Sequence, residues 1–236
     1  MNITELAVNL KLPYIRDHWR QLVDEAKHTK QDCAAFLENL LDCEWRQRLE
    51  NGQTRRIKEA KFPLKKYLVD FKRDKYDQVF GPKFEELETL AFIPNKENII
   101  LLGTSGAGKT HLAIALGIAA CMKGYNVLFA TVPNLILELK ETMGHNQLSN
   151  YRKRFEKYDL VILDELGYVS MDKSSCEMLF NLIQKGYIMT LIALICIQKS
   201  HILSWFYMER DIWSLASMSD AVYYFCTVLK NPGTKL

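Results

Sequence analysis

The feature that most constrains this chain is a glycine-rich octapeptide at residues 103–110, which reads Gly-Thr-Ser-Gly-Ala-Gly-Lys-Thr. It fits the pattern G-x-x-x-x-G-K-[ST], and it lies between a short apolar run, residues 98–102, and a helix-compatible run, residues 110–123. Glycines let the backbone wrap closely around phosphate oxygens, and the start of a helix adds the positive end of its dipole. The sequence therefore predicts a strand, a phosphate-binding loop and a helix, in that order.

The last two residues of the loop carry side-chain chemistry. Lys109 is expected to reach the β- and γ-phosphates of a bound nucleotide. The Thr110 hydroxyl is expected to bind Mg²⁺, a hard ion that keeps several waters and takes few protein ligands. We predict the whole loop as the binding site for ATP, with these residues: Gly103, Thr104, Ser105, Gly106, Ala107, Gly108, Lys109 and Thr110.

A second motif, Asp164-Glu165, ends an apolar strand-like run that begins at Leu160. Neighbouring strands of a parallel sheet end at the same edge, so Asp164 is expected to hold Mg²⁺ beside the phosphate loop. Glu165 would then orient an attacking water, which a hydrolase needs and a small-molecule kinase must exclude. The plainer alternative is that the two acids only cap the end of a strand. Together with Lys109, they form the predicted catalytic set.

Apolar runs alternate with helix-compatible stretches after Pro94. Residues 126–131 and 160–163 are predicted as further strands, residues 134–143 as a helix, and Gly124 as a helix C-cap. Strands buried on both faces and separated by helices are typical of a parallel sheet. The predicted fold class is therefore α/β, a P-loop NTPase sheet flanked by helices and preceded by a small N-terminal helical region.

The first 60 residues have the spacing of helices. Thr29 and Asp32 precede an apolar run and are predicted to form a capping box. Residues 37–60 contain no proline and one glycine, which favours a long helix, and Phe62-Pro63 marks its end.

Several segments resemble one family, the IstB-like and DnaC-like AAA+ ATPases, which are helper ATPases of insertion-sequence transposition and replicative helicase loaders. The segments are residues 103–117, residues 164–169 and the run Arg-Arg-Ile-Lys-Glu-Ala-Lys-Phe-Pro at residues 55–63. Residues 97–103 and 10–13 are similar to the transposition-helper branch. The resemblance covers about residues 5–183 and implies an AAA+ type of fold with ATP hydrolysis.

The resemblance also implies partners, and the charge pattern supports one of them. Residues 46–75 hold eleven Lys/Arg and four Asp/Glu, so their net charge is 11 − 4 = +7 in a chain of net charge +3. Duplex DNA, bound without sequence preference, is the expected polyanion, although a solvated helix face is an equally common origin of such a run. The candidate DNA contacts are Arg46, Arg48, Arg55, Arg56, Lys58, Lys61, Lys65 and Lys66.

Three regions are predicted from these observations: a basic helical region for DNA or a partner at residues 1–75, the AAA+ core at residues 76–183, and an atypical apolar tail at residues 184–236. The tail has eight charged residues, and Arg210 is the only arginine after Ile183. The family's polar sensor and trans-acting arginine find no match there, so weak ATP turnover and an exposed, aggregation-prone tail are expected. A frameshift or truncation would produce such a tail, whereas residues 188–197 and 221–229 are apolar enough to be strands that complete the sheet.

Other features narrow the classes of function. The six cysteines form no C-x-x-C pair, residues 1–10 lack a signal-peptide pattern, and the longest apolar run, residues 187–197, is too short to span a membrane. A cytoplasmic protein with buried thiols and no membrane partner is therefore expected. His111 is interpreted as a helix-surface or supporting residue rather than a catalyst. Tyr67 lies between Phe62 and Phe71, and these aromatics are expected to pack in the core more often than to stack on bases.

The leading hypothesis is an ATP-hydrolysing AAA+ protein that assembles on DNA as an ATP-dependent homo-oligomer and assists a transposase. Two alternatives stay open within the family: a loader of the replicative helicase, and a remnant that binds nucleotide without hydrolysing it. A P-loop kinase is the third alternative.

Overall fold

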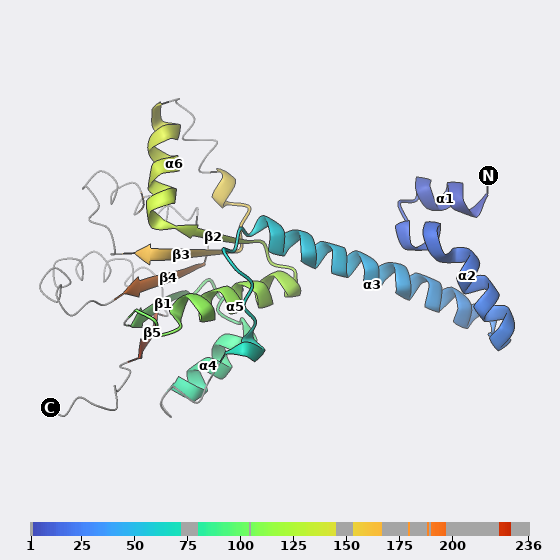
Figure 1. Ribbon diagram of the computed structural model, residues 1–236, viewed down its shortest axis with the longest axis horizontal. Helices are drawn as coiled ribbons and strands as arrows, with labels where there is room; N and C mark the ends of the chain where they lie inside the picture. The colour runs from blue at the N-terminus through green and yellow to red at the C-terminus, as the bar shows by residue number, and fades with distance from the viewer. Residues whose placement is uncertain are drawn as a thin grey trace, which may run out of the picture. The chain divides into compact units, whose positions relative to one another are not determined.

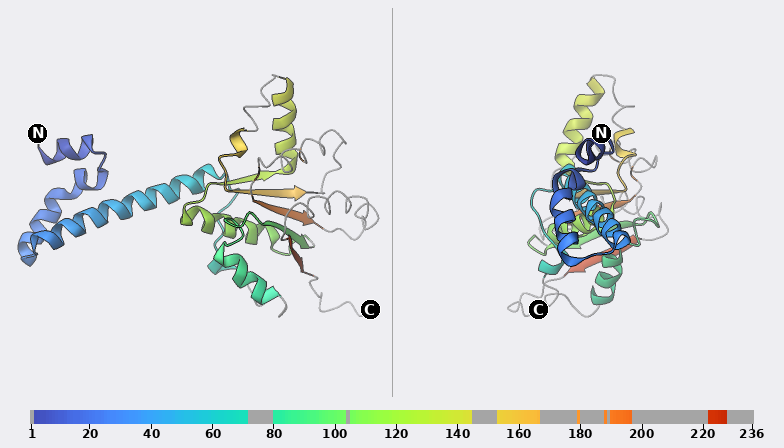
Figure 2. Two further views of the ribbon diagram at one scale, coloured as in Figure 1. Left: turned by 180° about the vertical axis from the view of Figure 1, so that it is seen from behind. Right: turned by 90° about the vertical axis from the view of Figure 1, so that its right-hand side faces the viewer.

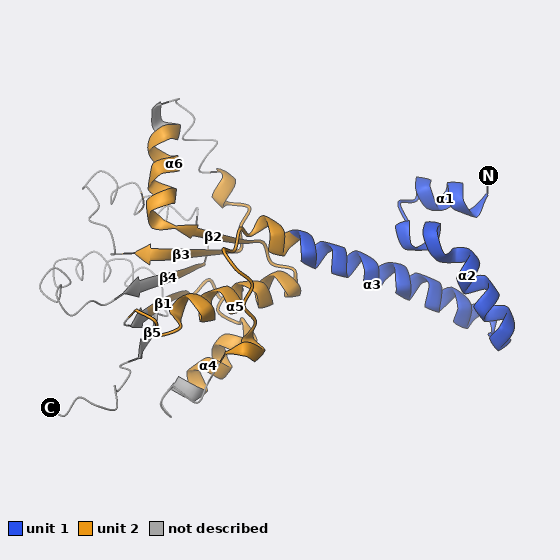
Figure 3. Ribbon diagram, viewed as in Figure 1, with its two compact units in different colours: residues 1–55 blue, residues 56–236 orange. Residues whose placement is uncertain are grey.

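The computed structural model describes residues 2–71, 80–103, 105–144, 153–166, 179, 188, 190–196 and 222–227. The chain divides into two compact units, Met1–Arg55 and Arg56–Leu236 (Figure 3). The first unit is made of helices, and the second contains a parallel sheet with helices against it.

Three helices make up the first unit: α1 (Ile3–Asn9), α2 (Pro13–Thr29) and most of α3 (Cys33–Glu59). Asn2 starts α1 through a reciprocal capping box, in which its side chain accepts from the Glu5 amide at 2.8 Å and the Glu5 carboxylate accepts from the Asn2 amide at 3.1 Å. Pro13 occupies the first turn of α2, where its missing N–H leaves no gap in the hydrogen bonding. The long helix predicted through residues 37–60 is confirmed as α3.

The capping box predicted from Thr29 and Asp32 is wrong. Thr29 belongs to the last turn of α2, where its hydroxyl donates to the Glu25 carbonyl at 2.9 Å. Asp32 alone caps α3, because its carboxylate accepts from the Ala34 amide at 3.1 Å. A chain reversal with Lys30 in the left-handed conformation separates the two residues, and the sequence spacing alone does not reveal it.

One buried carboxylate joins two helices of the first unit. Glu44 of α3 is buried, and it accepts a hydrogen bond from the Ile15 amide in the first turn of α2 at 3.1 Å. The positive end of the α2 dipole and the Arg48 guanidinium, 3.2 Å away, both stabilise its negative charge. Glu44, in the middle of α3, therefore caps the N-terminal end of α2.

Among the described residues, the second unit contains a five-stranded sheet whose strand pairings are all parallel. The order of the strands across the sheet is β2-β3-β4-β1-β5 (Figure 1). Since parallel strands end at one edge, the loops that follow them gather there. The strands are β1 (Asn98–Gly103), β2 (Val127–Thr131), β3 (Leu160–Leu166), β4 (Leu191–Cys196) and β5 (Val222–Thr227).

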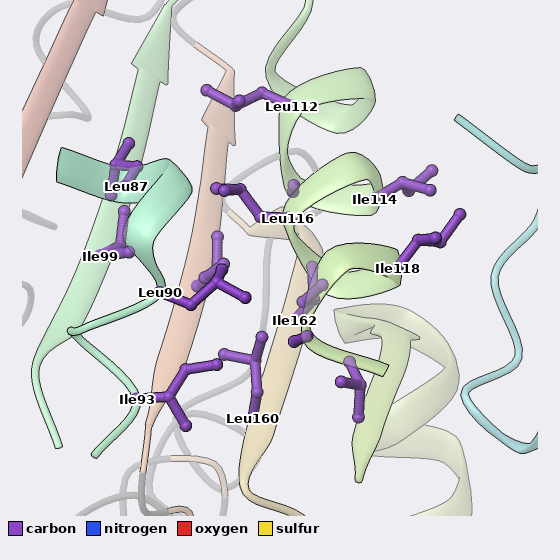
Figure 4. Packing of buried hydrophobic residues seen from close by; sticks show 14 of the residues in the cluster. Leu87, Leu90, Ile93, Ile99, Leu112, Ile114, Leu116, Ile118, Leu160 and Ile162 are labelled. Atoms are coloured by element: carbon purple, nitrogen blue, oxygen red, sulfur yellow. The ribbon is translucent and has the colours of Figure 1, made fainter. Parts of the chain in front are cut away.

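Helices cover both faces of this sheet, as the two views of Figure 2 show. Alternation along β1 creates the two faces: Ile99 and Leu101 belong to the core beneath α5 (Lys109–Lys123) and α4 (Phe80–Thr89), whereas Ile100 belongs to the core beneath α6 (Val132–Gly144). Figure 4 shows the first core, with Leu112 and Leu116 of α5 directed toward the strands. The predicted α/β class is confirmed.

The chain after α3 is anchored on the second unit rather than on the helical region. Ala60 is fully buried, and its carbonyl accepts from the Phe129 amide of β2 at 2.8 Å. Phe62 packs so closely on α5 that a Cβ at Gly117 would come within 2.8 Å of its ring. The short 3-10 helix η1 (Leu68–Asp70) follows, and Phe71 then stacks on Phe84 with ring centroids 5.3 Å apart.

The compact units thus divide within α3, and residues 56–71 pack with the sheet. The functional division predicted at residues 75 and 183 stays a prediction. Within the described part of the chain, no helix is both long enough and apolar enough to cross a membrane.

Two segments of the predicted tail complete the sheet. β4 and β5 pair with β1 on either side, through residues such as Ile192 opposite Ile99 and Tyr223 opposite Ile99. Ile188, Thr190 and Ile192 are buried. The alternative in which these runs are strands is confirmed. The expectation of an exposed tail is wrong for residues 188 and 190–192, which are buried, because hydrophobic pattern rather than motif defines buried strands.

Candidate nucleotide-binding site

The glycine-rich loop joins β1 to α5 at the carboxyl edge of the sheet. Gly106 and Gly108 adopt φ angles of +78° and +86°, in the left-handed region that side chains disfavour. Apart from Gly106 and its two chain neighbours, no described heavy atom lies within 4 Å of the position that a Cβ on Gly106 would take, so this side of Gly106 is open. The loop can therefore approach phosphate oxygens as the motif predicts; Thr104 lies outside the described residues.

Lys109 is the first residue of α5, and it is 8% exposed. Helix α5 begins directly at the loop, since the Leu112 amide donates to the Gly108 carbonyl at 2.9 Å. The partly positive end of the helix and the Lys109 ammonium thus lie at the same point. This combination is suited to a multiply charged anion.

Thr110 and Asp164 meet although they are 54 residues apart in the chain. The Thr110 hydroxyl donates to Oδ2 of Asp164 at 3.1 Å. Hydroxyl and carboxylate oxygens are the ligands that Mg²⁺ prefers in proteins, and Mg²⁺ takes only one or two of them beside phosphate oxygens and water. The two side chains therefore fit the metal of an ATP complex.

One part of the sequence interpretation of this edge is wrong. It treats the strand that carries Asp164 as the neighbour of the strand before the loop, whereas β4 lies between β3 and β1. Thr110 still contacts Asp164, because it lies in the first turn of α5 beyond the end of β1 and all strands end at the same edge.

Glu165 lies at an irregularity of β3. The pairing register with β4 shifts between Leu163 and Leu166, and Glu165 has a φ of +64°. Its amide donates to Oδ1 of Asp164 at 2.8 Å, and its side chain is exposed. A bulge beside a site redirects one side chain out of the alternation of the strand. Here the bulge lets the two adjacent acids face different ways: Asp164 contacts Thr110, and Glu165 is exposed to solvent.

His111 packs beside the loop instead of lying on the helix surface. Its ring meets the edge of Phe71 at a centroid distance of 5.4 Å, and its Nε2 is buried with no hydrogen-bond partner among the described residues. The prediction of a supporting rather than a catalytic residue agrees with this position. The sequence offered no sign that Phe71, forty residues earlier, would be its neighbour.

The structure separates the predicted DNA-contact residues into two groups. In the first group, Arg46 pairs with Asp42 at 2.6 Å, Arg48 pairs with Glu44, and Arg56 donates from Nε to the Cys121 carbonyl at 2.9 Å. Arg56 thereby caps the end of α5, and its assignment as a DNA contact stays a prediction. The other five are exposed, except for the half-buried Lys66: Arg55, Lys58, Lys61, Lys65 and Lys66.

Residues 152–154 are a further basic run, in which Arg154 pairs with Glu138 at 3.2 Å and Arg152 lies outside the described residues. The expectation of buried thiols holds for Cys121, where burial raises the pKa to about 11. It is wrong for Cys33, which is exposed.

The fold and the loop together define a P-loop NTPase of the AAA+ type. Solved structures share this fold: AMPPCP-bound DnaA from Aquifex aeolicus has a TM-score of 0.55 and 18% identity over 70% of this chain and 51% of its own. A DnaI crystal structure has a TM-score of 0.51 and 18% identity over 68% of this chain and 90% of its own. At these identities the likeness concerns the fold.

The family follows from sequence comparison. The family model of the IstB-like ATP binding proteins matches residues 5–233, and the chain belongs to this family. An insertion sequence IS21 ATP-binding protein of Pseudomonas aeruginosa is 35% identical over 77% of this chain and 69% of its own length. The corresponding IS5376 protein of Geobacillus stearothermophilus is 33% identical over 78% and 74%.

The family match extends beyond the point at which the motifs end. It reaches residue 233, and an IS21-like protein of Bacteroides fragilis is 27% identical over 98% of this chain and 88% of its own. The end of the resemblance expected at Ile183 was therefore too early. Arg210 lies outside the described residues, so the role of this arginine and the frameshift hypothesis stay predictions.

Proposed function

We propose that this protein is a DNA-associated helper ATPase that binds ATP with Mg²⁺, hydrolyses it, assembles on duplex DNA as a homo-oligomer and assists a transposase. The observation that carries the proposal is the contact between Thr110 and Asp164 at the end of the glycine-rich loop. It joins the two halves of a nucleotide-hydrolysing site in a chain whose relatives are insertion-sequence ATP-binding proteins.

Each residue of the site has a defined task in this proposal. The amides of residues 103–110 and the Lys109 ammonium bind the phosphates, and Thr110 and Asp164 hold Mg²⁺. ATP supplies a phosphoanhydride bond whose cleavage is strongly favourable. The protein contributes position and charge, which is where most of the catalysis of phosphoryl transfer lies.

Glu165 is the residue proposed to orient and deprotonate the attacking water. Its exposed carboxylate lies one residue from Asp164, and the bulge in β3 keeps it out of the sheet. A kinase would need to keep water away from this position, so an exposed acid favours hydrolysis over the kinase alternative.

The transposase is preferred to a replicative helicase as the partner because the relatives described above belong to insertion sequences. DNA is expected to bind through exposed lysines and arginines, since these side chains neutralise phosphates without reading sequence. A loader of the helicase and a remnant without turnover remain the competing candidates.

Steady-state ATPase measurement with and without random-sequence duplex DNA tests the proposal. A DNA-associated ATPase should turn over ATP faster when DNA is present, and the Glu165→Gln variant should bind ATP but lose this turnover. Tight ATP binding with no turnover in either condition would support the remnant instead. Phosphate transfer to an added small-molecule acceptor in place of water would support the kinase.

A further inference from the structure

A short strap, defined here as residues 61–70, lies along α5 and is fixed to it at both ends. Phe62 packs on Gly117 in the middle of α5, and Phe71, directly after the strap, meets His111 in its first turn. Phe62 and Leu68 pack against the core that contains Ile114 and Ile118, two α5 residues that Figure 4 shows on the side away from the strands. In Figure 1 the trace after α3 passes α5 and reaches η1 beside α4.

The outward side of the strap carries apolar side chains that the fold does not use. Val69 is 91% exposed, Leu64 is 47% exposed and Tyr67 is 40% exposed. Of the aromatics predicted here, Phe62 and Phe71 pack inward, as expected, whereas Tyr67 does not. Core packing therefore explains the two phenylalanines and leaves Tyr67 and Val69 without a structural task.

The strap and the end of α3 also carry exposed positive charge. Lys58, at the end of α3, and Lys61 and Lys65 of the strap are exposed, and Lys66 is half-buried. None of the four lysines forms an ion pair with any residue that the structure describes. Glu59 and Asp70 are the acids of this stretch, so lysine charge exceeds acid charge by 4 − 2 = +2 before Arg55 and Arg56 are added. Such a surface attracts a polyanion.

We propose that the strap is the surface on which duplex DNA docks, with its lysines on the phosphates and Tyr67 and Val69 against sugars and base edges in a groove. The proposal rests on the DNA association proposed above and assigns it a place. Single apolar side chains between lysines suit a groove with phosphates on both sides. A protein partner would instead need a contiguous apolar centre with charges at the rim.

A chain of contacts connects the strap to the nucleotide site. Phe71 contacts His111, the residue directly after Thr110, and Thr110 contacts Asp164. DNA that orders the strap would thus order the first turn of α5, which holds the phosphate loop. We therefore expect the same strap residues to govern the stimulation of ATP turnover by DNA.

The experiment uses the full chain and two double variants, measured by fluorescence anisotropy with a random-sequence duplex at several salt concentrations. Tyr67→Ser with Val69→Ser removes apolar contacts and no charge, so affinity should fall roughly tenfold while the salt dependence is unchanged. Lys61→Ala with Lys65→Ala should lower affinity and also reduce the slope of log affinity against log salt by about 2. Both variants should retain ATP affinity and lose DNA stimulation.

Matched controls lie elsewhere on the second unit. Leu137→Ser changes an exposed apolar residue of α6, and Lys83→Ala with Lys157→Ala removes two exposed lysines, so both should bind DNA as the parent chain does. If the parent binds duplex DNA and the strap variants bind it equally well, the strap proposal is overturned and the proposed function stands; an acidic protein partner would give this result. If the parent chain binds no DNA, both the strap proposal and the proposed function are wrong.

Discussion

The two compact units use their apolar residues in opposite ways. In the second unit, leucines and isoleucines fill two cores on the faces of the sheet. In the first unit, only Ala7, Ile15 and Glu44 are buried among the described residues. Its exposed large apolar residues outnumber its buried ones: Ile3, Leu6, Val8, Leu10, Leu37, Leu41, Trp45 and Leu49.

This difference shows that burial of apolar side chains defines the structure of the second unit and not that of the first. Apolar side chains that alternate along strands and repeat along α5 determine one packed arrangement of the second unit. The first unit is held instead by caps and a buried carboxylate, which define the helix ends but bury little apolar surface. We therefore expect the second unit to carry both the chemistry and most of the stability.

The largest effect is expected for Glu165→Gln in the second unit. The amide keeps the size of the side chain and loses the base, so ATP turnover should fall by about 10²- to 10⁴-fold while ATP binding persists. Single-turnover hydrolysis and equilibrium nucleotide binding, measured on the same variant, separate the two effects. Loss of ATP binding with normal turnover of the bound fraction would contradict the role of Glu165.

Lys109→Ala should weaken ATP binding by about a hundredfold, because a charge-assisted contact to the phosphates is lost at a buried position. The control is Lys83→Ala, which removes an exposed lysine of α4 and should bind ATP normally. Helical content of the first unit should be the same in both variants. Parent-like nucleotide affinity for Lys109→Ala would remove the loop from the site.

Gly117→Ala tests how tightly the second unit is packed. The added Cβ would lie 2.8 Å from Ile162 Cδ1 and 2.8 Å from Phe62 Cε1, which is closer than real Cβ contacts. The free energy of unfolding should fall by about 1–3 kcal/mol, seen as a lower melting temperature of the second unit.

Phe62→Leu supplies the matched partner for that test, because it shortens one of the two side chains that the new methyl meets. In a double-mutant cycle, the cost of Gly117→Ala should be smaller when position 62 is leucine. Equal costs in both backgrounds would mean that Phe62 does not lie on α5, and the anchoring of the strap would be lost with it.

The sequence predicted the parts of this molecule that depend on local backbone and failed where distant parts meet. Strand β1, helix α5 and its Gly124 cap depend on local sequence, and all three were predicted correctly. The insertion of β4 between β3 and β1 depends on which strand pairs with which, and no short motif records that choice. Thr110 and Asp164 were nevertheless brought together correctly, because all parallel strands end at one edge.

The charged residues show the same limit. Charge counting treated all eight basic candidates alike, but Arg48 and Arg56 serve the fold through Glu44 and the Cys121 carbonyl. Helical spacing signals the pair of Arg48 and Glu44, four residues apart, whereas Arg56 and Cys121 are 65 residues apart and carry no such signal. Long-range partners have to be seen in the structure.

The smallest effect is expected in the first unit, for Leu41→Ser combined with Trp45→Ser on α3. Both residues are more than half exposed, so the free energy of unfolding should change by no more than about 0.5 kcal/mol. Ile15→Ser is the contrasting variant, because Ile15 is buried in the same unit and its loss should cost about 2 kcal/mol or more. Chemical unfolding followed by far-ultraviolet circular dichroism measures both. Equal destabilisation by the two variants would mean that Leu41 and Trp45 are covered in solution. The exposure of apolar residues in the first unit would then come from the absence of the chain that covers them, and not from a difference in how the two units fold.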